Sequence, residues 1–154
     1  MSKPKIAFFT EGTYTGKPSR TGPNTRTDLA WMIALDAFHI PILDDSKFVE
    51  GKDFDLGIII LPKKNISVLI QSPRFIDTIK QNCKKIAFMQ EGPNWNWQDY
   101  TMTEQIWYFN TLQEADFLLC HNRSDVNYYN GLTGKNTYRM QSLMIEDSLV
   151  GLAQ

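Results

Sequence analysis

The chain has 154 residues, 16 basic and 17 acidic, and a formal net charge of −1 at pH 7. This length suits one domain, so we expect residues 1–154 to form a single domain. A charge balance this even provides no general field for nucleic acid or for an anionic membrane, so neither partner is indicated.

Targeting and metal-ligand patterns are also missing from the sequence. No apolar run reaches the ~20 residues that a membrane span needs. The opening residues Met1-Ser-Lys-Pro-Lys5 lead straight into an apolar run, which predicts no signal peptide and a cytoplasmic protein. Two cysteines and two histidines lie far apart and lack ligand spacing, so we expect buried reduced thiols, no metal and no cofactor.

Apolar periodicity and turn residues predict strands that alternate with helices. In chain order we expect a strand at 5–10, a long loop at 11–25, a helix from about 27 to 39, strands at 40–43 and 55–61, a helix from 72–73, a strand at 85–90, a helix at 103–113, a strand at 115–120, a helix at 125–132 capped by Ser124, and an extended segment at 136–144. This alternation predicts an α/β, Rossmann-like fold with a mostly parallel sheet and helices on both faces.

One short stretch occurs twice, as Lys-Ile-Ala-Phe-Phe-Thr-Glu-Gly at 5–12 and Lys-Ile-Ala-Phe-Met-Gln-Glu-Gly at 85–92. Apolar runs of this kind are typical of parallel strands buried on both faces. If the strand order is 3-2-1-4-5-6, these two strands are neighbours at the switch point of the sheet. Glu11 and Glu91 would then lie about 5 Å apart, on a cleft between the loops at 10–26 and 90–98.

The loop after the first strand contains Gly12, Gly16 and Gly22 together with the cations Lys17, Arg20 and Arg26. The glycine spacing, with Pro18 after Lys17, does not fit a phosphate-binding Walker loop. Cations before a helix N-terminus still favour an anion such as a diphosphate. The alternative is an ordinary solvated surface loop.

Polar side chains at strand ends supply the other candidates. Glu11 and Glu91 can act as a carboxylate pair or as caps of the loops that follow them. His121, with Asn122 beside it, follows a buried strand and can serve as a base or as a structural residue.

An aromatic loop follows the second copy of the repeat and contains Trp95, Trp97 and Tyr100. Its rings can stack on a sugar or a base, fold onto the core or meet a protein partner.

The order of these segments resembles the amino-terminal half of a GT-B-type glycosyltransferase. The segments that carry the resemblance are Gly22-Pro-Asn-Thr-Arg-Thr-Asp-Leu-Ala30, Ile40-Pro-Ile-Leu43, Asp53-Phe-Asp55-Leu-Gly-Ile-Ile-Ile, Ala115-Asp116-Phe-Leu-Leu-Cys-His-Asn and Tyr128-Tyr129-Asn-Gly131-Leu. The likeness spans essentially the whole chain, but the first loop lacks the family's plain Gly-Gly.

The resemblance implies the acceptor-binding half of an enzyme that transfers a sugar from a nucleotide-sugar donor. Gly12 and Gly22, with Arg20 or Arg26, would face the donor diphosphate. Glu91 and His121 would line the acceptor cleft, and one of them would act as base. The nucleotide-sugar half is not within these residues, so a C-terminal domain or a partner chain would supply it.

Two other functions remain open from the residues alone. The chain could be a non-catalytic binding or interaction module of the same fold. It could instead be a small enzyme that uses Glu11 or Glu91 as a nucleophile on a nucleoside-like substrate.

Overall fold

The computed structural model describes residues 3–10, 27–41, 53–61, 73–90 and 99–141. In these residues six strands alternate with four helices. The strands are β1 (Ile6–Thr10), β2 (Phe38–Pro41), β3 (Phe54–Leu61), β4 (Cys83–Gln90), β5 (Phe117–Cys120) and β6 (Thr137–Arg139); the helices are α1 (Thr27–Ala34), α2 (Pro73–Asn82), α3 (Met102–Leu112) and α4 (Arg123–Thr133). The expected sequence of elements is therefore confirmed in these ranges.

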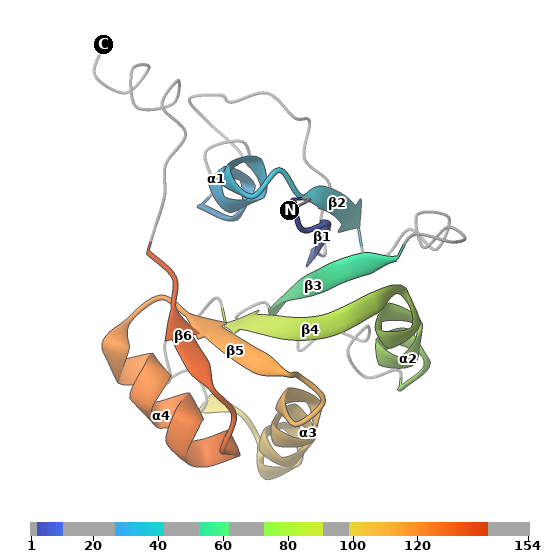
Figure 1. Cartoon of the computed structure of the whole chain (residues 1–154). Coiled ribbons are helices and arrows are strands. Elements are labelled where there is room, and N and C mark those ends of the chain that lie inside the picture. The colour runs from blue at the N-terminus through green and yellow to red at the C-terminus, as the bar shows by residue number, and fades with distance from the viewer. Residues whose placement is uncertain (1–2, 11–26, 42–52, 62–72, 91–98, 142–154) are drawn as a thin grey trace.

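The strands form one sheet in the order β2-β1-β3-β4-β5-β6, and every neighbouring pair is parallel. Helices α2, α3 and α4 lie on one face and α1 lies on the other (Figure 1). This confirms the α/β, Rossmann-like fold with a parallel sheet and helices on both faces. Ile58, Ile59, Ile86, Phe88 and Leu118 are buried, as strands covered on both faces require.

The strand order differs from the expected one. The two copies of the repeat are β1 and β4, and both belong to the sheet, but β3 lies between them and pairs with each. The prediction that they are neighbours is wrong. Their carboxyl ends are two strand spacings apart, about 10 Å rather than 5 Å.

Two features of β3 account for its place beside β1. Asp55 N–H donates to Lys5 O at 2.8 Å, and Asp55 Oδ2 accepts from Lys5 N–H at 2.8 Å. Gly57 has no side chain, so Phe9 from β1 and Cys83 from β4 approach closely: a Cβ at Gly57 would lie 3.0 Å from the Phe9 ring and 2.7 Å from Cys83 Sγ. A larger residue would separate the three strands.

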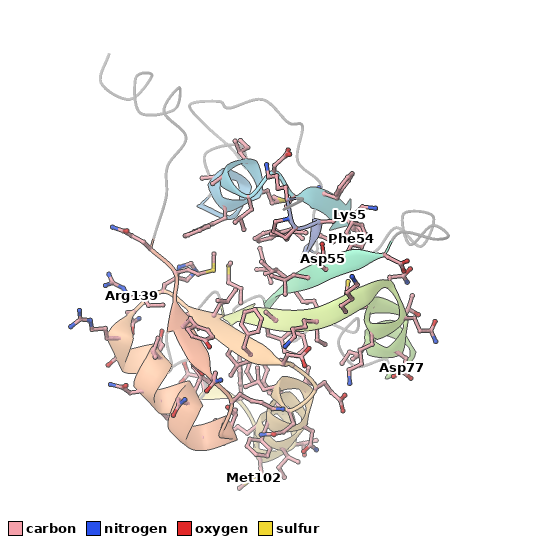
Figure 2. All side chains as sticks on the ribbon, in the orientation of Figure 1. Lys5, Phe54, Asp55, Asp77, Met102 and Arg139 are labelled. Carbon is pink, nitrogen blue, oxygen red and sulfur yellow. The ribbon has the colours of Figure 1, made fainter. Side chains whose placement is uncertain are left out.

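Lys5 also stabilises this end of the sheet. Its Nζ lies 5.2 Å from the centre of the Phe54 ring and 5.7 Å from that of the Phe38 ring, so it makes cation–π contacts with both. Figure 2 shows Lys5, Phe54 and Asp55 gathered in one place. The same residues therefore join β1 to strands on either side of it.

Helix α1 ends earlier than its sequence predicts, at Ala34 instead of about His39. Asp36 has a φ of 49°, and the N–H groups of Asp36 and Ala37 donate to Ile33 O and Met32 O. This pattern is a Schellman motif, which closes a helix with one left-handed residue. Strand β2 can then begin at Phe38.

Gly57→Ala should destabilise the fold by roughly 1–3 kcal/mol, because the new methyl group would overlap Cys83 Sγ and the Phe9 ring. Gly131→Ala is the matched control: a Cβ at Gly131, in α4, meets nothing within 4 Å, so this change should stabilise by about 0.5–1 kcal/mol. Urea unfolding of both variants measures the difference. Equal effects would show that β3 does not need a glycine there.

The stability of the sheet should also fall in acid through Asp55. The hydrogen bond from Lys5 N–H and then that from Lys84 hold the pKa of this carboxyl below its usual 3.8. Because the pKa of Asp55 is lower in the folded state, its carboxylate stabilises the fold at pH values above its pKa in the unfolded chain, near 4. This stabilisation disappears as the pH falls through the lower pKa of the folded state. Asp55→Asn should therefore flatten the dependence of the unfolding midpoint on pH below about 4, whereas Asp77→Asn, exposed on α2, should not.

Candidate functional site

The carboxyl ends of all six strands lie at one edge of the sheet, because the strands are parallel. The winding reverses between β1 and β3: β2 lies on one side of β1, and β3 to β6 follow on the other. In doubly wound folds ligands bind outside the carboxyl ends at such a reversal. The expected crevice therefore moves from β1 and β4 to β1 and β3.

Most of the predicted site residues lie outside the described ranges. They are Glu11, Gly12, Lys17, Arg20, Gly22, Arg26, Glu91, Trp95 and Trp97. Their roles stay predictions, although the strand order removes the reason to treat Glu11 and Glu91 as a close carboxylate pair. His121 and Asn122 can be followed in detail.

His121 directly follows β5, which pairs with β4 in the sheet. The sequence places Glu91 directly after β4, so His121 and Glu91 follow neighbouring strands of the sheet. The His121 side chain is half-buried, and its Nδ1 is buried without a hydrogen-bond partner in the described part of the chain. An imidazole nitrogen buried in this way costs about 1–3 kcal/mol unless a partner is supplied. His121 Nδ1 is therefore suited to contact a ligand.

The main chain of His121 is fixed by a hydrogen bond from β6 and by the start of α4. Its carbonyl accepts a hydrogen bond from Arg139 Nε at 3.5 Å, which joins the end of β5 to the end of β6. The next residue, Asn122, is extended, with φ −139° and ψ 162°, and begins α4. The imidazole is thus anchored between a strand end and a helix start.

Asn122 caps helix α4 through both of its side-chain groups. Its Oδ1 accepts from Asp125 N–H at 2.8 Å, and its Nδ2 donates to Asp125 Oδ2 at 2.8 Å. The expected cap, Ser124, lies inside the helix and is exposed. The sequence Asn122-Arg-Ser-Asp125 has the spacing of a capping box, and that signal could have identified Asn122 and Asp125.

Asp125 gives the start of α4 a negative character. Its side chain is buried, with 2% exposed, and it lies in the first helical turn. The positive end of the helix dipole stabilises a carboxylate in this position. An uncapped helix N-terminus would attract a phosphate, but at the start of α4 the phosphate would meet the buried acid Asp125. This end of the sheet therefore favours a neutral polar ligand.

Buried hydroxyl and thiol groups from α3, α4 and β5 belong to one core cluster. These groups are those of Tyr108, Cys120 and Tyr129, with Tyr100 packed at the rim, where its ring centre is 5.9 Å from that of Tyr108. Burial raises the pKa of Cys120 to about 12, and the nearby Asp125 adds to the shift. Burial also raises the pKa of both Tyr108 and Tyr129.

These groups therefore stay protonated at neutral pH. The Cys120 thiol is no nucleophile, because thiol reactivity depends on the thiolate. The burial of Tyr108 and Tyr129 identifies both as packing residues of the core.

Within the described ranges no group of three or more His, Cys, Asp or Glu side chains is arranged to hold a metal ion. None of the helices seen in these ranges is both long and apolar enough to span a membrane. Comparison with protein-family models, with curated proteins and with solved structures found no match. The functional argument therefore rests on this chain's own residues.

Asn122→Ala should destabilise the protein by about 2 kcal/mol, because α4 loses its cap and the buried Asp125 carboxylate loses a donor. Ser124→Ala, two residues later and exposed, should change stability by less than about 0.5 kcal/mol. Chemical denaturation of the two variants separates the predictions. A larger effect at Ser124 would contradict the observed cap.

Proposed function

We propose that this chain binds a hydroxyl-bearing acceptor at the carboxyl end of β5 and is the acceptor half of a GT-B-type glycosyltransferase. One observation carries the proposal: His121 Nδ1, at the carboxyl end of β5, is buried and has no partner among the described residues. A ligand hydroxyl can give or accept the missing hydrogen bond.

The local charge supports an acceptor in preference to a phosphate at this position. Asn122 already occupies the start of α4, and the buried Asp125 carboxylate lies within its first turn. Both features disfavour binding of an anion at this position, but they do not disfavour a neutral hydroxyl group. The donor diphosphate would instead meet Lys17, Arg20 and Arg26, as the sequence resemblance implies.

The proposed chemistry needs one proton acceptor. The acceptor hydroxyl would bond to the anomeric carbon of the sugar as the bond from that carbon to the nucleotide diphosphate breaks. The hydroxyl proton would pass to His121, because an imidazole nitrogen can act as a general base. Glu91, the residue that follows β4, is the other candidate base.

The protein offers a direct test because it contains only two histidines, His39 and His121. Long-range ¹H–¹⁵N spectra of the imidazole rings, recorded during titration with a panel of neutral saccharides, should show saturable shifts at His121 Nδ1. His121→Ala should weaken binding of that saccharide at least about tenfold, the value of one good hydrogen bond. His39→Gln, on β2 and four strands away from β5, should leave binding unchanged.

Transfer is tested by adding a nucleotide sugar together with a C-terminal donor half supplied in trans. Product formation that His121→Ala or Glu91→Gln reduces at least a hundredfold would support the proposal and identify the base. Absence of saccharide binding in every condition would overturn it. Turnover by the 154-residue chain alone, lost in Glu91→Gln, would favour the nucleoside enzyme, and a protein complex lost on changing Trp95 and Trp97 would favour the interaction module.

A further inference from the structure

The peptide that joins His121 to Asn122 lies between two fixed parts of the chain. Before it, the carbonyl of Cys120 accepts from the N–H of Met140 at 2.7 Å, where β5 and β6 end together. After it, Asn122 is extended and caps α4. The carbonyl of His121 accepts instead from a side chain, at 3.5 Å from Arg139 Nε.

The register of the sheet brings Arg139 to this peptide. Arg139 is the last residue of β6 and lies opposite Cys120 in the pairing of β6 with β5. Neighbouring strands are about 4.8 Å apart, so a long side chain at this position can reach the residue that follows Cys120. In Figure 2 Arg139 lies where β6 ends and α4 begins. The arginine therefore spans from one strand to the first residue beyond its neighbour.

A bond to the His121 carbonyl also limits the directions open to the imidazole. It fixes the plane of the peptide that follows His121, and with it the ψ angle of this residue. The rotamers that a side chain can adopt depend on the φ and ψ of its own residue. A group that contacts a ligand must be held within about 0.5 Å of its working position, so this restraint bears on binding.

We propose that Arg139 is a positioning residue: its Nε–H bond holds the His121 imidazole in the rotamer that presents Nδ1 to the acceptor hydroxyl. Arg139 acts through His121 and not on the acceptor itself. The role in binding rests on the proposed function, whereas the effect on the imidazole exists without a ligand.

Two substitutions at Arg139 separate the hydrogen bond from the charge. Glutamine carries its amide Nε2 on Cδ, the atom that carries Nε in arginine, so Arg139→Gln keeps a donor there and removes the charge. Arg139→Met removes both. Arg123→Met is the matched control, because Arg123 is also exposed, lies at the start of α4 and forms no hydrogen bond or ion pair with the described residues.

Three-bond couplings about χ1 of His121, measured without ligand, report the rotamer directly. We expect one dominant rotamer in the wild-type chain, in Arg139→Gln and in Arg123→Met, and averaging over several rotamers in Arg139→Met. The thermal midpoint should change little in every variant, because the bond is exposed. An unchanged rotamer in Arg139→Met would overturn the proposal, and so would equal averaging in Arg139→Gln or Arg123→Met.

Saccharide binding tests the consequence for the site. Arg139→Met should weaken binding of a saccharide that shifts His121 Nδ1 by roughly 2–10-fold, and Arg139→Gln should restore it. Unchanged binding in Arg139→Met, despite an averaged rotamer, would contradict the positioning role. A chain that binds no saccharide would overturn the proposed function, while the couplings measured without ligand would still decide whether Arg139 orients His121.

Discussion

The fold depends on two aspartates, Asp55 and Asp116, that join neighbouring strands through both their backbone and their side chains. Asp55 exchanges two hydrogen bonds with Lys5, and Asp116 does the same with Ile86: in each case the Asp N–H donates to a carbonyl and its carboxylate accepts the N–H of that residue. A single side chain thus joins β3 to β1, and another joins β5 to β4. Since unpaired backbone donors are costly, these hydrogen bonds favour the observed pairing and register together.

Much of the fold could be predicted from the sequence because the relevant signals are local. Apolar runs bounded by Gly, Pro and Lys identified the strands, and the alternation with helices identified a parallel sheet. The position of β3 between β1 and β4 in the strand order was not predictable in the same way. It depends on Asp55 reaching Lys5, fifty residues away, and on Gly57 accepting Phe9 and Cys83, and neither contact leaves a periodic pattern in the chain. The end of helix α1 was also missed, and the predicted helix is longer than the observed one. Asp36 takes the left-handed conformation that is usual for glycine, so no glycine marks the end of the helix in the sequence.

The candidate site was partly predictable for a related reason. A polar residue directly after a buried strand has a position fixed by that strand, so His121 could be assigned to the carboxyl edge. The function of Asn122 depends on the turn that follows, where its side chain is shared with Asp125. The capping spacing was present in the sequence, but the burial of Asp125 follows from the packing of α4 on β5 and could not be read from composition. Together these contacts leave His121 Nδ1 as the polar atom at this end of β5 that has yet to find its partner among the described residues.

The position of β1 inside the sheet has a consequence for synthesis of the chain. Strand β1 is synthesised before both of the strands that pair with it: β2 begins at Phe38 and β3 at Phe54. At about 5–20 residues per second, Phe8 and Phe9 would wait several seconds for β3 to be made. The apolar strand β1 is therefore a nascent segment that a chaperone can bind, and both of its edges are paired only after β3 has been made.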